Sequence, residues 1–213
     1  MGAPAEGGGA SVSLEWSTRP LNGKSVEAFF VSTGVVTLAE IGDKTQLLAL
    51  LLAARFRRPW PIIWGILFAT IANHALAGAL GQLIADLVSD TLLYVLLAIS
   101  FLAVAAWTLV PDKLDEDDTP PISRYGAFMA ALVAFFLAEM GDKTQVATVV
   151  LAAQFDAYLW VVLGTTLGMM LANVPVVFLG HAVAGKLPLG LIRGITAVIF
   201  LLLGVYAGWL AWS

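Results

Sequence analysis

Two nearly identical charged segments, ninety-nine positions apart, constrain this chain more than any other feature. Residues 38–46 and 137–145 differ only where Ile41 is replaced by Met140, and both lie inside long apolar stretches. A charged side chain at membrane depth costs about 2.5 to 3.5 kcal/mol even on lenient insertion scales, so such residues mark functional sites by default. The duplication therefore predicts two half-sites that together form one functional site.

The composition is that of an integral membrane protein. Hydrophobic residues make up 60% of the chain and charged residues only 12%, whereas soluble domains have about 25% charged residues. The chain has no cysteine, which excludes disulfides and thiolate metal sites. The net charge of −4 arises largely from one acidic segment, residues 112–118, and therefore does not indicate a nucleic-acid partner.

Six stretches are apolar and long enough to cross a lipid bilayer as helices, which takes about 20 residues each. They run over residues 28–54, 60–85, 91–110, 126–153, 158–184 and 190–211. We therefore predict an all-α polytopic membrane protein with six transmembrane helices. The expected divisions are a flexible tail (1–27), a first three-helix repeat (28–110), an acidic cytoplasmic linker (111–125) and a second three-helix repeat (126–213).

The internal repeat extends beyond the charged segments. The same offset of ninety-nine aligns Gly65 with Gly164, and Phe101 with Phe200. A unit with an odd number of spans enters the membrane from opposite sides in its two copies, which is the plan of many secondary transporters. We therefore expect two inverted repeats related by an axis in the membrane plane.

The orientation of the chain follows from its basic residues, because cytoplasmic loops are enriched in lysine and arginine. One side of the predicted bundle holds Arg55, Arg57, Arg58, Lys113, Arg124, Lys186 and Arg193, and the other side holds Arg19 and Lys24. The side with seven basic residues is expected to be cytoplasmic. Both termini would then lie outside the cytoplasm, and we expect the protein in a bacterial inner membrane.

Each charged segment places two acids and a lysine at positions i, i+3 and i+4, which share one face of a continuous helix. These triplets are Glu40, Asp43 and Lys44 in the first copy, and Glu139, Asp142 and Lys143 in the second. The glycine between the two acids permits either close helix approach or local unwinding that frees backbone carbonyls as ligands.

Four carboxylates in one place favour a hard divalent cation, because Ca²⁺, Mn²⁺ and Mg²⁺ prefer oxygen ligands. We expect the metal ligands to be Glu40, Asp43, Glu139 and Asp142. Neighbouring residues with supporting roles are Lys44, Lys143, Thr45, Thr144, Gln46 and Gln145. Clustered carboxylates also take up protons, because desolvation and mutual repulsion disfavour their ionised form. A cation and protons would compete for the same oxygens, which is the minimal requirement for an antiporter.

Three polar residues on the middle spans, two in the first repeat and one in the second, are further supporting candidates. For Asn73 and Asn173 we consider two roles, as cation ligands or as hydrogen-bonding residues between helices. For His74, which aligns with Asn173 at the repeat offset, we consider a ligand, a proton relay or a donor to a backbone carbonyl.

Other functions remain open from the residues alone. A buried acid–lysine pair can lock two helices together, although each copy here holds an additional acid that such a lock does not need. An amine or amino-acid transporter similar to lysine exporters, an intramembrane hydrolase with paired acids as general acid and base, and a membrane scaffold are the further alternatives. The chain lacks a Walker-A spacing, which argues against an ATP-driven pump.

The two E-x-G-D-K-T motifs within six apolar spans resemble those of the Gdt-type family of cation/proton antiporters. The resemblance covers residues 28–212 and includes residues 72–76, residues 164–168 and the segment from Asn173 to Pro175. It implies exchange of Mn²⁺ or Ca²⁺ for protons, with the four motif acids as ligands. We expect export of Mn²⁺ from the cytoplasm, with Ca²⁺ as the alternative substrate, no permanently bound cofactor and no enzymatic activity. The expected partners are the cation, protons and the lipid bilayer.

Overall fold

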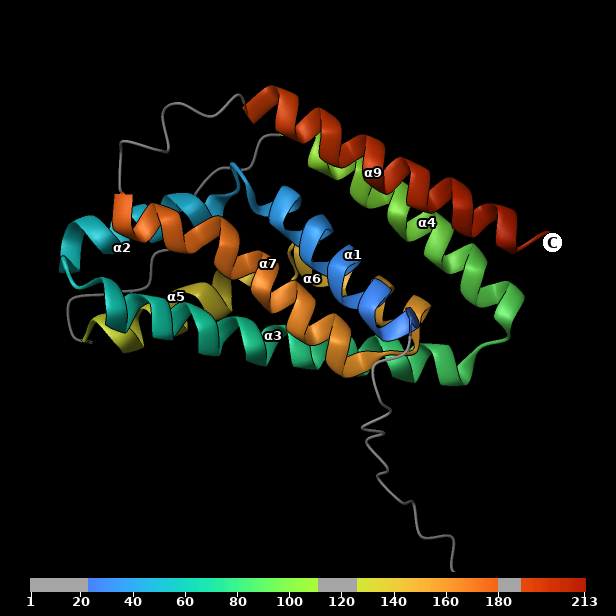
Figure 1. The fold of residues 1–213 in the computed structure, drawn as a ribbon, viewed down its shortest axis with the longest axis horizontal. Helices are drawn as coiled ribbons and strands as arrows, with labels where there is room; N and C mark the ends of the chain where they lie inside the picture. Colours follow the sequence, from blue (N-terminus) through green and yellow to red (C-terminus); the bar gives the residue numbers. More distant parts are fainter. Residues whose placement is uncertain (1–22, 111–125, 180–188) are drawn as a thin grey trace, which may run out of the picture.

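A computed structural model describes residues 23–110, 126–179 and 189–213, and the regular elements in these ranges are all α-helices (Figure 1). In chain order they are α1 (Gly23–Glu40), α2 (Lys44–Phe56), α3 (Pro59–Leu87), α4 (Asp90–Thr108), α5 (Ala127–Glu139), α6 (Lys143–Phe155), α7 (Tyr158–Leu179) and α9 (Leu189–Leu210). The predicted all-α class is confirmed for these ranges. Helix α1 begins inside the predicted tail; the remainder of the tail and the acidic linker lie outside the described residues.

Four of these helices, α3, α4, α7 and α9, are long and apolar enough to cross a membrane. Helices α1 and α2 add a fifth candidate span if they count as one, since they meet at a bend of 71°. Helix α5 is a shorter apolar helix, which α6 follows after a break of three residues. The described residues thus hold four or five candidate spans, and the stretches 28–54 and 126–153 are broken rather than continuous helices.

Glycine at the centre of each motif breaks the helix. Gly42 has φ 83° and Gly141 has φ 79°, in the left-handed region that glycine adopts without strain and that commonly ends a helix. Asp43 then caps α2, with its side chain accepting a hydrogen bond from the Thr45 backbone N–H, and Asp142 occupies the same position before α6. The prediction that each acid–lysine triplet shares a continuous helical face is therefore wrong, and local unwinding is the alternative that the chain adopts.

Close contacts between helices recur at the repeat offset. Gly65 of α3 lies so near α5 that an added Cβ would come within 2.6 Å of the Phe128 carbonyl oxygen. Gly164 of α7 lies equally near α1, where a Cβ would come within 2.5 Å of the Phe29 carbonyl oxygen. Gly164 lies ninety-nine positions after Gly65, and Phe128 lies ninety-nine positions after Phe29, so both members of each contact are related by the repeat. The α3–α5 and α7–α1 pairs are thus equivalent packing units.

Helices α4 and α9 form a third pair and lie side by side (Figure 1). The rings of Phe101 and Phe200, which are fully buried, lie 6.1 Å apart at their centroids. These two residues are themselves related by the repeat offset, so the two copies meet at equivalent positions. The pair packs on the remaining helices through α4 against α6 and α9 against α1.

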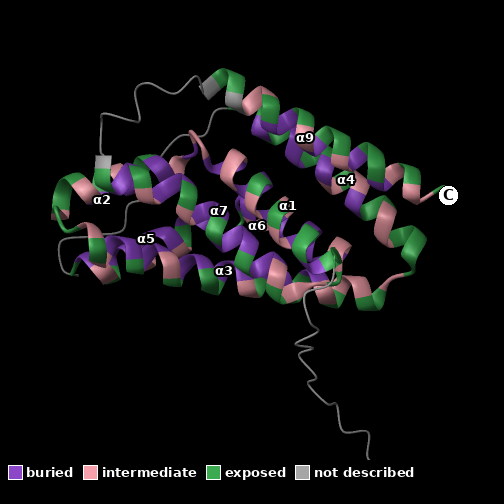
Figure 2. Cartoon of the chain, in the orientation of Figure 1, coloured by how far each residue is buried: buried purple, intermediate pink, exposed green. Residues whose placement is uncertain are grey.

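The buried residues line the inner faces of the helices, and exposed residues line the outward faces (Figure 2). Many of the exposed residues are large and apolar. Exposed examples include Phe68, Leu83, Ile99 and Leu202. Lipid tails are as apolar as these side chains, so a bilayer accommodates this surface where water would not. Several apolar helices with such a surface identify an integral membrane protein.

Candidate cation site

Three carboxylates meet where the two broken helices face each other. One oxygen from each of Glu40, Glu139 and Asp142 lies within 4.8 Å of the others. The residues are buried, with exposed fractions of 0%, 0% and 4%. A single cation with oxygen bonds of about 2.1 to 2.6 Å fits between oxygens at this separation. The group combines the end of α1 with the end of α5 and the residue that caps α6, so both motifs contribute.

The fourth motif acid, Asp43, lies in a buried ion pair with Lys143 of the other motif. The Lys143 ammonium donates to Asp43 Oδ1 across one hundred positions of sequence. Their side chains are 4% and 0% exposed, respectively. Among the described motif acids, Asp43 is the one outside the three-carboxylate group. Lys44, the counterpart of Lys143, is half-buried at the first position of α2.

The two motif threonines both donate to the same glutamate. Thr45 Oγ1 lies 2.6 Å from one carboxylate oxygen of Glu40, and Thr144 Oγ1 lies 2.5 Å from the other. Both oxygens of Glu139 are buried and have no hydrogen-bond partner among the described residues. An ionised carboxylate without partners is costly to bury, so the place of Glu139 suits a bound proton or a cation.

Each motif glutamine closes the turn that precedes it. Gln46 Oε1 accepts a hydrogen bond of 2.9 Å from the Gly42 backbone N–H, and Gln145 Oε1 accepts one of 2.7 Å from Gly141. The amide nitrogen of Gln46 also donates to the carbonyl oxygen of Ala172 on α7, at 2.9 Å. The glutamines therefore stabilise the unwound segments that carry the acids.

The polar residues of the middle spans lie in the buried interior. Asn73 donates to the Phe136 carbonyl oxygen at 3.0 Å and so links α3 to α5, as the hydrogen-bonding role requires. Asn173 donates to the Met169 carbonyl oxygen of its own helix at 3.1 Å. His74 is fully buried, and neither ring nitrogen has a hydrogen-bond partner in the described part of the chain. The predicted donation from His74 to a carbonyl is not observed.

Buried hydroxyls without partners were missed by the sequence analysis. Within the described ranges these are the side chains of Ser32, Thr70 and Thr166. The only signal for them in the sequence is a lone hydroxyl residue in an apolar span, which usually bonds to its own helix, as Thr165 does to the Val161 carbonyl oxygen at 2.9 Å. The Ala172 carbonyl, as a backbone group, has no sequence signal at all.

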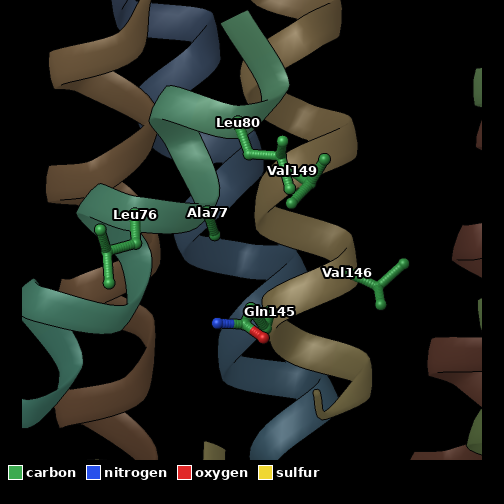
Figure 3. A pocket seen from close by; sticks show the side chains of 6 residues that line it. All are labelled: Leu76, Ala77, Leu80, Gln145, Val146 and Val149. Atoms are coloured by element: carbon green, nitrogen blue, oxygen red, sulfur yellow. The ribbon is translucent and has the colours of Figure 1, made fainter. Parts of the chain in front are cut away.

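A cavity of about 260 Å³ lies between α3 and α6, beside the second motif. Figure 3 shows the Gln145 side chain in the space between the two helices. The lining residues are Leu76, Ala77, Leu80, Gln145, Val146 and Val149. The walls are thus largely apolar, and Gln145 supplies the polar group.

Comparison with known proteins places this arrangement in a family. A "Putative manganese exporter" of Vibrio cholerae is 57% identical over 176 residues, which cover 82% of this chain and 87% of the relative. A GDT1-like protein of Synechocystis is 28% identical over 201 residues, covering 85% and 97%. GDT1-like protein 4 of Oryza sativa is 29% identical over 201 residues, covering 82% and 70%. No solved structure matches the chain significantly.

The family model described as "Divalent cation/proton antiporter GDT1" matches residues 28–116 and 127–213, which include both motifs. This match spans most of the chain in two halves that correspond to the two copies of the repeat. The chain therefore belongs to the GDT1 family of divalent cation/proton antiporters.

Proposed function

We propose that this protein exports Mn²⁺ from the cytoplasm in exchange for protons, at one site shared by two inverted repeats. The observation that carries the proposal is the buried group of Glu40, Glu139 and Asp142, whose oxygens lie within 4.8 Å of one another. These hard oxygen ligands suit Mn²⁺ and also Ca²⁺, which remains the alternative substrate. The name of the Vibrio cholerae relative favours manganese.

The proposed architecture has six spans, in which α1 with α2 and α5 with α6 each form one broken span. Discontinuous helices at the midplane are a recurring way to build ion sites in secondary transporters, because the unwound backbone is tolerated where it lines a site. The equivalent contacts of Gly65 and Gly164 support a repeat of three spans. The Phe101–Phe200 contact supports an axis that runs between α4 and α9.

Exchange follows from the competition of a cation and protons for the same carboxylates. Glu139, which has no hydrogen-bond partner, is available to a proton in the cation-free protein and to the cation after the proton leaves. Glu40 is held in place by the two threonine hydroxyls, so its oxygens are already directed into the site. If two protons leave for each divalent ion that binds, the net charge of the site is unchanged.

The role of the ion pair is to keep a positive side chain next to the acids without blocking them. Lys143 compensates Asp43, which leaves the other three carboxylates for the cation. In this assignment Glu40, Glu139 and Asp142 are the primary cation ligands. Asp43 pairs with Lys143 and is not a primary ligand. An amine transporter or an intramembrane hydrolase is favoured by no observation on the described residues.

The test is Mn²⁺ flux into liposomes that contain the purified protein, with and without an imposed pH gradient. Glu139→Gln keeps the shape of the side chain but removes its charge and its exchangeable proton, and Asp142→Asn does the same at the neighbouring ligand. We expect each to lower gradient-driven flux at least about tenfold, since a lost bond to a charged group is worth about 1.5 to 3 kcal/mol. Glu27→Gln, at an exposed position of α1, is the matched control and should transport normally.

Full Mn²⁺ flux in both ligand variants would refute the shared site. Flux that ignores the pH gradient in the parent protein would refute proton exchange. Parallel measurements with Ca²⁺ decide which ion is preferred, because both ions use the same oxygens and differ in the size and rigidity of the site that they require.

A further inference from the structure

The helix packing of the two repeats is matched, but the contacts of their glutamines are not. The close contacts of Gly65 of α3 with α5 and of Gly164 of α7 with α1 show that the close helix pairs are the same in both copies. Gln46 and Gln145 occupy equivalent positions and close equivalent turns. Only Gln46 reaches beyond its own motif, to the Ala172 carbonyl of α7. The difference therefore lies between the motif segments and the middle helices.

The contact of Gln46 joins the two repeats. Its side chain is 8% exposed and makes two hydrogen bonds of 2.9 Å, one to the turn of its own motif and one to α7 of the other repeat. Motion of α2 relative to α7 would break the second bond. In this conformation the first motif is thus tethered to the middle helix of the second repeat.

Among the described residues, the equivalent hydrogen bond of the second motif is not formed. Applying the repeat offset to the Gln46–Ala172 bond gives a bond from Gln145 to the carbonyl oxygen of Asn73 on α3. The Gln145 amide nitrogen makes no hydrogen bond within the described ranges, and the side chain is half-buried. It stands instead beside the cavity between α3 and α6, which gives it room to move (Figure 3).

We propose that Gln46 and Gln145 are alternating tethers of the transport cycle, each formed in one of two access states and broken in the other. In the state described here, Gln46 is bound to the Ala172 carbonyl and Gln145 faces the cavity. In the opposite state, Gln145 binds the Asn73 carbonyl, its cavity closes, and a corresponding space opens between α2 and α7. Both are positioning residues for the exchange proposed above, on which this inference rests.

The threonine contacts show the same asymmetry independently. Both hydroxyls go to Glu40, although the repeat would allow either glutamate to receive them. Glu139, which belongs to the motif whose glutamine does not bond to a middle helix, accepts no hydrogen bond among the described residues. Two kinds of polar contact thus agree that the first motif is the more firmly held one in this state.

The absence of cysteine makes a direct test practical, because a single introduced cysteine is the only thiol in the protein. Val149→Cys places a reporter on the wall of the cavity, and Leu50→Cys places one at the equivalent position of α2. Their rates of reaction with a small water-soluble methanethiosulfonate are measured in lipid nanodiscs, which expose both membrane faces. The ratio of the Val149→Cys rate to the Leu50→Cys rate reports the balance between the two states.

The tethers predict opposite shifts of this ratio. Gln46→Met keeps the length of the side chain but removes the tether of the present state, so the ratio should fall about fivefold, the population change that one hydrogen bond of about 1 kcal/mol controls. Gln145→Met removes the tether of the opposite state, so the ratio should rise by about the same factor. Gln46→Asn, whose amide is too short to reach α7, replaces the methionine variant if that variant does not fold.

A merely structural role for the glutamines predicts a different result. Loosening the fold would raise both reporter rates, and the ratio would stay constant or shift in the same direction in both variants; either result overturns the proposal. The labelling is done without Mn²⁺, so it does not depend on which ion is carried. The proposed function is tested separately, by the Mn²⁺ flux of the parent protein and of the ligand variants, so its failure is distinguishable from failure of this inference.

Discussion

The ion pair between Lys143 and Asp43 provides a quantitative test of how the two motifs are held together. Replacing Lys143 with methionine keeps most of the side-chain volume but removes the ammonium group that compensates the buried Asp43 carboxylate. Breaking a buried pair in this way costs about 3 to 5 kcal/mol. The carboxylate can avoid part of this cost by taking up a proton, which at pH 7 costs an aspartate of ordinary acidity about 4 kcal/mol. We therefore expect Lys143→Met to lower the free energy of unfolding by about 4 kcal/mol at pH 7.

The pH dependence of this loss follows from the protonation step. Each pH unit changes the cost of proton uptake by about 1.4 kcal/mol, so the loss should shrink to about 1.5 kcal/mol at pH 5. The sign is fixed, because protons are more available at the lower pH and the variant therefore recovers as the pH falls. The free energy of unfolding is measured by titration with dodecyl sulfate in mixed micelles, at both pH values.

The double variant Asp43→Asn with Lys143→Met separates the ion pair from general damage. It buries two neutral side chains, so it should recover most of the stability that Lys143→Met alone loses. Lys24→Met, at an exposed position of α1, is the control and should change the stability by less than about 0.5 kcal/mol. A double variant that loses the sum of the two single losses, or a loss that is the same at pH 5 and pH 7, would refute the reasoning.

Three further predictions use the same unfolding assay. An added Cβ at Gly81 would lie 2.2 Å from the Val149 carbonyl oxygen, so Gly81→Ala should cost about 1 to 3 kcal/mol by forcing α3 and α6 apart; an unchanged stability would contradict this close packing. A Cβ added at Gly34 would have no other atom within 4 Å, so Gly34→Ala should stabilise α1 by about 0.5 to 1 kcal/mol. A lower free energy of unfolding would show that the space around this position is not open. Thr144→Val removes a donor from the buried carboxylate of Glu40 and should cost about 1 to 3 kcal/mol. A loss below about 0.5 kcal/mol there would show that the hydroxyl is not needed.

The sequence was sufficient to identify the membrane class, the all-α architecture and the family, because apolar runs and a duplicated motif are local signals. It did not predict the helix breaks, because Gly42 and Gly141 are compatible with both close helix approach and unwinding, and only the fold decides between them. The placement of side chains by helical periodicity failed for the same reason, since it assumes a continuous helix. The six inverted spans and the orientation of the termini remain predictions.

The grouping of the motif acids could be predicted only in part. Two copies of one motif suggest a shared site, but they do not say that Lys143 would pair with Asp43 of the other copy. They also do not say that both threonine hydroxyls would go to Glu40. Equal residues in a repeat can make unequal contacts, because the relative positions of the helices depend on packing over the whole bundle.

The two breaks at the glycines have an electrostatic consequence. They bring four helix ends close together, since α1 and α5 end there and α2 and α6 begin there. The backbone dipoles of a helix sum to about half a negative charge at its carboxyl end and half a positive charge at its amino end. A cation bound beside Glu40 and Glu139, as proposed, would therefore meet two negative helix poles, while Asp43 and Asp142 lie at two positive ones. The polypeptide backbone thus adds partial charges of both signs to the site, beside those of the acidic and basic side chains.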